Sequence, residues 1–109
     1  MIEKKIETGY LLDFYGSLLS ARQREVIDMY YNDDMSLSEI SSEIGISRQG
    51  VRDIIVKSSS LLGEYEEKLG MAGKFGKISE LSAKYGRTAE ETGNTDLQAF
   101  IKAVLDIVE

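Results

Sequence analysis

Apolar residues recur along this chain at spacings of three and four, and the chain contains no proline. This spacing is the period of amphipathic α-helices, whereas the alternation of apolar and polar residues that indicates strands is scarce. The clearest stripe lies near the C-terminus, where Leu97, Phe100 and Val104 share one face of a helix. The sequence therefore predicts an all-α fold, with helices over about residues 3–15, 21–31, 36–44, 48–69, 75–86 and 95–108.

Small polar residues and glycines mark the ends of several of these helices. Ser20 and Ser47 stand where N-caps are expected. Ser36 with Glu39 three residues later has the pattern of a capping box, in which each side chain binds the other residue's backbone N–H. Gly45 ends the third helix, because the turn that follows needs a positive φ.

The spacing of glycines suggests where the chain divides. Gly70, Gly73 and Gly76 lie close together, so we expect a flexible joint near residues 70–76. Residues 87–94 are polar and are expected to form a loop, with one extra helical turn over Thr88–Glu91 as the alternative. The expected organisation is a helix-turn-helix domain over residues 1–70 and a C-terminal helical extension over residues 71–109, which could serve in dimerisation.

The segment 37–56 has the pattern of a helix-turn-helix unit. Such a unit needs an inward apolar residue in its first helix, a small residue where the helices cross, a tight turn with glycine, and apolar anchors in its second helix. Each of these positions is filled by a suitable residue at a suitable offset. The predicted core of the unit is Ile40, Ser41, Ile44, Gly45, Ile46, Val51 and Ile54.

In that geometry the second helix presents its N-terminal, outward residues to the major groove of DNA. Arginine can bind guanine with two hydrogen bonds, and glutamine can bind adenine in the same way. The candidate base-reading residues are Ser47, Arg48, Gln49 and Arg52. The candidate phosphate-binding residues are Arg22, Arg24 and Lys57.

Several observations favour a different use of the same fold. The chain has 13 Lys and Arg against 19 Asp and Glu, a net charge of −6, which argues mildly against nucleic acid. Arg22 and Arg24 can instead pair with nearby carboxylates such as Glu25. Asp53 would repel phosphate, and Gly50 is a poor helix former within the helix that should read DNA.

Composition excludes most enzyme classes. Without Cys or His the chain has no disulfide, thiolate nucleophile, ordinary zinc site or Ser-His-Asp arrangement. Its clustered carboxylates imply no apolar pocket, so we expect no catalytic residue, no metal and no cofactor. Residues 1–6 lack the apolar stretch of a signal peptide, and no apolar run approaches the ~18 residues of a membrane span. We expect a cytoplasmic protein without membrane insertion.

Four segments resemble region 4 of bacterial sigma factors, whose helix-turn-helix reads the −35 promoter element: Leu19–Ile27, Tyr30–Tyr31, Met35–Ile40 and Gly45–Val51. Three others resemble the small YlxM-type proteins of Gram-positive bacteria and mycoplasmas: Tyr10–Leu19, Tyr30–Ile40 and Glu64–Leu69. The resemblance covers residues 1 to about 75. It implies a sigma region 4-like unit of the winged-helix-like superfamily, without the wing.

The YlxM resemblance also implies a part in the signal recognition particle pathway, beside whose genes that family is encoded. Because the polymerase-binding regions of a sigma factor are absent, this chain would not initiate transcription itself. The first hypothesis is a DNA-binding regulator that acts as a homodimer, since one unit reads only a few base pairs. The alternative is a protein-interaction module whose acidic Glu64, Glu66 and Glu67 bind a basic component of the signal recognition particle.

Overall fold

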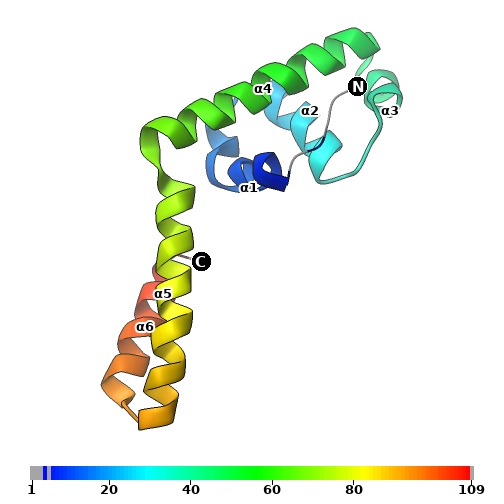
Figure 1. Ribbon diagram of the computed structural model, residues 1–109. Coiled ribbons are helices and arrows are strands. Elements are labelled where there is room, and N and C mark those ends of the chain that lie inside the picture. Colours follow the sequence, from blue (N-terminus) through cyan, green and yellow to red (C-terminus); the bar gives the residue numbers. More distant parts are fainter. Residues whose placement is uncertain (1–3, 5, 109) are drawn as a thin grey trace. The chain divides into compact units, whose positions relative to one another are not determined.

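A computed structural model describes residues 4 and 6–108, which form helices joined by short connections, with no strand in that part of the chain (Figure 1). The predicted all-α fold is confirmed. None of the described helices combines the length and apolar character that crossing a membrane needs. The elements are α1 (Ile6–Tyr15), a short 3-10 helix η1 (Gly16–Leu18), α2 (Ala21–Tyr31), α3 (Leu37–Ile44), α4 (Arg48–Leu69), α5 (Met71–Thr92) and α6 (Thr95–Val108).

The helix starts depend on local hydrogen bonds. Ser20 is the N-cap of α2, where its Oγ accepts a hydrogen bond from the Gln23 N–H at 3.2 Å. The Gln23 side chain accepts one in return from the Ser20 N–H at 3.0 Å. This second bond was not anticipated from the sequence, and it makes the start of α2 a complete capping box. The start expected for α1 at residue 3 lies outside the described residues, and Lys4 is not helical.

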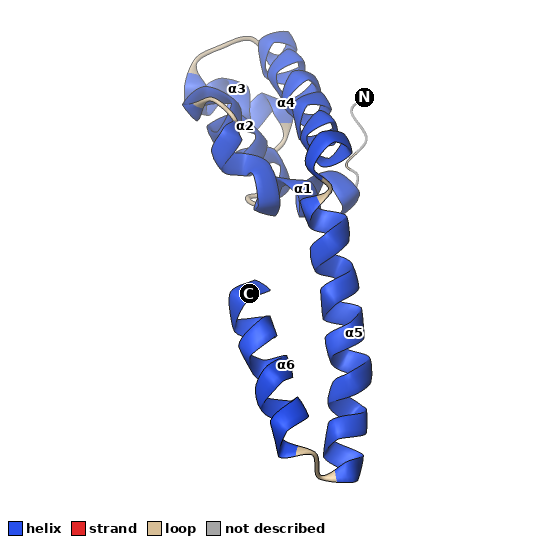
Figure 2. Ribbon diagram, turned by 90° about the vertical axis from the view of Figure 1, so that its left-hand side faces the viewer, coloured by secondary structure: helices blue, strands red, loops and turns tan. Residues whose placement is uncertain are grey.

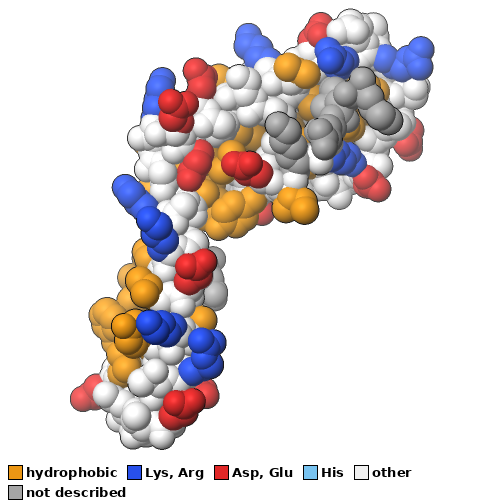
Figure 3. Space-filling view, viewed as in Figure 1, with side chains coloured by type: hydrophobic (Ala, Val, Ile, Leu, Met, Phe, Trp, Pro, Cys, Tyr) orange, Lys and Arg blue, Asp and Glu red, His pale blue; other side chains and the backbone are white. Residues whose placement is uncertain are grey.

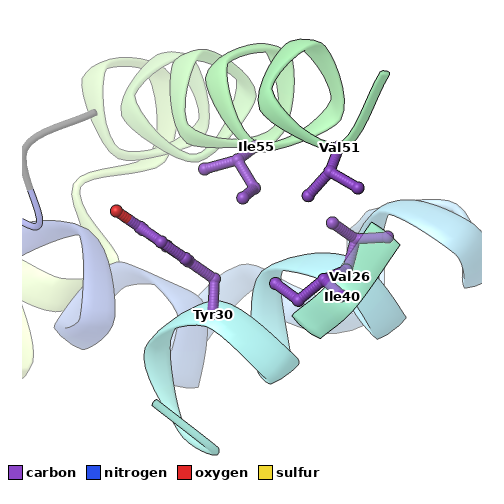
Figure 4. Packing of buried hydrophobic residues seen from close by; sticks show 5 residues of the cluster. All are labelled: Val26, Tyr30, Ile40, Val51 and Ile55. Atoms are coloured by element: carbon purple, nitrogen blue, oxygen red, sulfur yellow. The ribbon is translucent and has the colours of Figure 1, made fainter. Parts of the chain in front are cut away.

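The chain divides into two compact units, residues 1–70 and 71–109. The core of the first unit lies between α2, α3 and α4, where Val26, Tyr30, Ile40, Val51 and Ile55 pack together (Figure 4). Four of the five are fully buried, and Tyr30 is nearly so. This core fixes the angle between α3 and α4, because each helix contributes side chains to the same cluster.

Helix α1 packs against the second half of α4. It buries Leu11, Leu12 and Tyr15, while α4 buries Leu62. The Tyr15 hydroxyl donates a hydrogen bond to Glu66 Oε1 at 2.6 Å, which joins residues 51 positions apart in the sequence. The C-terminal half of α4 therefore binds α1, while its N-terminal half belongs to the helix-turn-helix.

The sequence prediction was wrong about the region around α5. Helix α5 begins at Met71 and continues to Thr92, so residues 71–76 are helical and the expected loop at 87–94 is reduced to a turn at Gly93, where φ is 66°. Among the clustered glycines only Gly70 ends a helix, with φ of 63°. A glycine within a helix costs only about 1 kcal/mol relative to alanine, so Gly73 and Gly76 do not by themselves interrupt α5.

The second unit is an antiparallel hairpin of α5 and α6 (Figure 2). Asn94 caps α6 by accepting a hydrogen bond from the Leu97 N–H at 3.0 Å. The predicted helix over 95–108 is confirmed. Its apolar stripe faces α5 only in part, because no residue of α6 within the described chain is fully buried.

Candidate nucleic-acid interface

The first helix of the helix-turn-helix begins with the predicted capping box. Glu39 N–H donates to Ser36 Oγ, and Ser36 N–H donates to Glu39 Oε1, both at 3.1 Å. The backbone N–H of Ser36 is the main cause that lowers the pKa of Glu39 below its ordinary value, and the Ser36 side chain acts in the same direction. The start of α3 therefore carries a charged, hydrogen-bonded carboxylate on the protein surface.

The turn between α3 and α4 is held by two short-range contacts. Gly45 has φ of 82°, a conformation that glycine adopts readily, and its N–H donates to the Ser41 carbonyl at 2.9 Å. The Ser41 hydroxyl donates to the carbonyl of Ile46. Ser41 is thus more than a small residue at a helix crossing, because its side chain ties α3 to the turn.

Apolar residues on both sides of the turn pack into the core of the unit. Ile40 and Val51 belong to the buried cluster, and Ile44, Ile46 and Ile54 are half-buried against it. Five of the seven residues predicted for the helix-turn-helix core therefore pack in this cluster, whereas Ser41 is half-buried and Gly45 is exposed in the turn. The remaining outward positions of α4 are available for contacts with a ligand.

The N-terminal turn of α4 carries the four candidate base-reading residues. Ser47 is the N-cap, and its Oγ accepts a hydrogen bond from the Gly50 N–H at 3.0 Å. Arg48 is exposed, and its Nη1 is 3.5 Å from Ser38 Oγ, which is a weak contact. Ser47 therefore acts first in capping α4, while Arg48 remains directed to solvent.

The other two base-reading candidates, Gln49 and Arg52, differ in whether another side chain already binds them. The Gln49 amide nitrogen donates to Asp53 Oδ1 at 2.8 Å, so Gln49 would have to exchange this bond for one to a base. Arg52 is exposed and takes part in no ion pair among the described residues. Lys57, one turn after Asp53, is also exposed without such a partner.

The two arginines of α2 pair with carboxylates of their own helix. Arg22 Nη1 lies 3.3 Å from Glu25 Oε1, and Arg24 Nε lies 3.7 Å from Asp28 Oδ2. Both pairs are solvent-exposed, where such pairs contribute little to stability and exchange readily. The pairing that the sequence left as an alternative for both arginines is therefore present, although it does not prevent phosphate contacts.

Figure 4 shows how α2 lies relative to α4. Val26 lies on the side of Val51, and Tyr30 lies on the side of Ile55, so the two helices run in the same general direction here. The first turn of α2, which carries Arg22, is therefore directed towards the end of the unit where α4 begins. This arrangement is compatible with a shared surface for Arg22 and the start of α4.

Sequence reasoning missed the contacts of Lys4. Its ammonium group pairs with Asp34 and lies 4.6 Å from the centre of the Tyr30 ring. The hydrogen bond from Lys4 is the main cause that lowers the pKa of Asp34. Asp34 has φ of 55° in the turn before α3, so Lys4 fixes the connection that leads into the helix-turn-helix. No local signal links residues 30 positions apart.

These features define an all-α protein of the helix-turn-helix class. The family model described as “Putative helix-turn-helix protein, YlxM / p13 like” matches residues 2–102, and the chain belongs to this family, UPF0122. A UPF0122 protein of Halalkalibacterium halodurans is 38% identical over 109 residues, which span all of both chains. A UPF0122 protein of Bacillus cereus strain AH187 is 42% identical over 106 residues, covering 95% of this chain and 96% of its own.

The extent of these matches corrects the sequence analysis. The resemblance was expected to end near residue 75, but the family model includes all of α5 and most of α6. The helical hairpin is thus part of what the family shares. Its apolar stripes are spread over helical turns without a compact motif, which explains why reading the residues gave no family signal there.

Proposed function

We propose that this protein is a DNA-binding regulator that reads bases from the N-terminal turns of α4. The observation that carries the proposal is the position of Arg48 and Arg52, exposed and without ion pairs within the described chain, at the start of the second helix of a helix-turn-helix. That helix end is where such units contact the major groove. Arginine there can bind guanine O6 and N7 together.

The surrounding residues would supply affinity without sequence preference. Arg22, Arg24 and Lys57 are the candidates for phosphate contacts, and the first two would exchange a carboxylate partner for a phosphate. A single unit reads only a few base pairs, so the proposed active form is a homodimer that binds two half-sites in the cytoplasm. Ser47 and Gln49 would contribute hydrogen bonds once Gln49 leaves Asp53.

The test is a fluorescence anisotropy titration of labelled duplexes that tile the DNA around the protein's own gene, at 50 and 200 mM salt. Three to five phosphate contacts predict that affinity falls roughly 40- to 500-fold between these salt concentrations. The Arg48→Ala/Arg52→Ala double variant should bind the preferred duplex about 30-fold or more weakly.

A matched control removes two exposed cations elsewhere. The Lys68→Ala/Arg87→Ala variant changes the net charge by the same amount and should keep the sequence preference. Binding that is equally weak for every duplex, or that is lost to the same degree in both double variants, would contradict base reading from α4.

Charge supports a second candidate function, which is binding to a basic protein or protein–RNA partner. Residues 1–70 carry thirteen Asp and Glu against eight Lys and Arg. Of the acidic residues near the end of α4, Glu66 accepts the hydrogen bond from Tyr15, while Glu64 and Glu67 are exposed. The YlxM resemblance nominates a component of the signal recognition particle as this partner.

This alternative predicts that the Glu64→Lys/Glu67→Lys variant loses binding to purified signal recognition particle, measured by surface plasmon resonance. Glu66 is left unchanged because its removal would disturb the packing of α1 on α4. Unchanged binding by the variant would contradict the acidic surface as the docking site. Loss of partner binding with intact DNA binding would show that the two functions use different faces.

A further inference from the structure

The hairpin of α5 and α6 has an apolar face that its own helices leave open. Helix α5 contributes Ile78, Leu81 and Tyr85 to it, and α6 contributes Leu97, Phe100 and Val104. These six residues, here called the apolar face, line a hollow of about 250 Å³. Phe100 is 65% exposed, and Ile107, about two turns further along α6, is 82% exposed. Figure 3 shows orange side chains gathered along one side of the hairpin.

The other side of the hairpin is different in chemistry. There a second hollow is lined by charged and amide side chains of Arg87, Glu90, Gln98, Lys102 and Asp106 together with apolar ones such as Ile101 and Leu105. The apolar face has no charged residue in its lining, so it is the side better suited to an apolar partner. Contiguous apolar surface of this kind on a soluble protein marks an interaction site.

The hairpin is too small to be stable with that face exposed. The unit has 39 residues, and below about 40 residues a fold usually needs disulfides, a metal or oligomerisation. Without Cys or His, this chain has neither disulfides nor an ordinary zinc site. Association with a further pair of helices would cover the face and produce a four-helix bundle.

Charge indicates which partner supplies those helices. Lys74 and Lys77 lie near the start of α5, whereas Glu90, Glu91 and Asp96 surround the turn to α6. A second copy of the hairpin placed antiparallel to the first would bring each basic end against an acidic turn. The first unit, with a net charge of −5, would instead repel the acidic turn.

We propose that the apolar face is the homodimer interface, on which the hairpins of two copies pack antiparallel as a four-helix bundle. This deepens the homodimer of the proposed function by assigning it a surface. It does not require DNA binding. Because the tests below contain no DNA, their failure is distinguishable from failure of the anisotropy titration.

The first test is sedimentation equilibrium of the full chain from 1 to 100 µM. Wild-type protein should have twice the mass of one chain at the upper concentrations. Phe100→Glu should raise the dissociation constant roughly 30-fold or more, because it places a charge in the centre of the apolar interface. Gln98→Glu adds the same charge two residues earlier in α6, on the side of the second hollow. This variant should dimerise as wild type does.

A second test does not endanger the fold, because it changes only exposed polar residues at the edge of the apolar face. The chain has no native cysteine, so Lys77→Cys and Thr88→Cys each give a single thiol, about three helical turns apart on one face of α5. Mixed under mild oxidation, the two variants should form a Lys77→Cys to Thr88→Cys crosslink faster than either forms a crosslink with itself. Faster self-crosslinking of each variant would overturn the antiparallel arrangement.

Other outcomes overturn the proposal as a whole. A wild-type chain that stays monomeric at 100 µM would mean that the apolar face is not a homodimer interface. Equal weakening by Phe100→Glu and Gln98→Glu would place the dimer interface elsewhere. Circular dichroism of Phe100→Glu distinguishes a folded monomer, which supports the proposal, from an unfolded hairpin, for which the cysteine pair decides.

Discussion

At the scale of single residues, Asp53 places a carboxylate within the candidate DNA-binding face. Its carboxylate lies one residue after Arg52 and holds the Gln49 amide at 2.8 Å. Replacing Asp53 with Asn keeps a hydrogen-bond acceptor for Gln49 but removes the charge that repels phosphate. At 50 mM salt we expect Asp53→Asn to bind DNA about fivefold more tightly, because one charge near a phosphate in water amounts to about 1 kcal/mol.

The same anisotropy titration checks this effect, and its salt dependence is part of the expectation. The gain should shrink at 200 mM, because mobile ions screen exposed charges. Asp13→Asn in α1 is the matched control, since it removes an equal charge outside α3 and α4. An unchanged or weaker affinity of Asp53→Asn would indicate that Asp53 positions Gln49 or contacts a cytosine, as an acidic side chain can.

Two glycines of the first unit should respond in opposite ways to the same substitution. Gly45 has φ of 82°, so Gly45→Ala should destabilise the first unit by about 1–2 kcal/mol. Gly63 lies within α4 with open space where a side chain would begin, so Gly63→Ala should stabilise the unit by about 0.5–1 kcal/mol. Urea unfolding followed by circular dichroism measures both, and equal signs would contradict the assigned backbone geometry.

At the scale of elements, the start of α3 couples helix stability to pH. Because Glu39 has a lower pKa in the folded chain than its ordinary value of 4.5, its charge stabilises the folded state. This contribution is complete above pH 4.5 and is lost as the pH falls through the lowered folded pKa. We expect wild type to melt at a higher temperature than Glu39→Gln at pH 7, with the difference vanishing in acid.

Helix α2 provides the comparison for this prediction within the same chain. Its capping box uses Gln23, which carries no charge, so it contributes no such pH dependence. Gln23→Glu should create a second acid-sensitive cap and raise the melting temperature at pH 7 but not near pH 3. A difference between wild type and Glu39→Gln that persists in strong acid would contradict the capping-box mechanism.

Several elements followed from the sequence because their causes are local. The N-caps Ser20, Ser36 and Ser47 and the positive φ at Gly45 depend on residues at most four positions away. The extent of α5 could not be predicted from the sequence, because the tertiary surroundings of a glycine decide whether the helix ends there. Gly70 ends a helix, whereas Gly73 lies within α5, and their local sequences do not distinguish them.

The candidate site was predictable in its residue types and less so in its contacts. The bond between Gln49 and Asp53 joins side chains four residues apart, so helical spacing alone could have indicated it. The pairs Lys4–Asp34 and Tyr15–Glu66 join residues 30 and 51 positions apart. Such pairs arise from tertiary packing, which one sequence read along its length does not reveal.

At the scale of the whole molecule, charge is distributed unequally between the two units. Residues 1–70 have a net charge of −5 and residues 71–109 a net charge of −1. Association through the first unit would bring two strongly acidic bodies together, which opposes it. The nearly neutral hairpin is thus the better place for a dimer contact.

Two units with different partners should unfold in different ways. If the first unit folds alone and the hairpin folds as a dimer, scanning calorimetry of the full chain should resolve one transition that is independent of protein concentration and one that is not. A tenfold rise in concentration should move the second transition upward by about 5 °C or more, since only the folded bundle is dimeric. Gly45→Ala should lower the first transition alone.

Phe100→Glu provides the complementary change, because it acts on the hairpin and leaves the first unit intact. It should abolish the concentration dependence and lower only the second transition. One cooperative transition that shifts with both substitutions would mean that the two units stabilise each other within a chain. The dimer contact and the helix-turn-helix would then be coupled, and a variant that weakens dimerisation would also melt the surface proposed to read DNA.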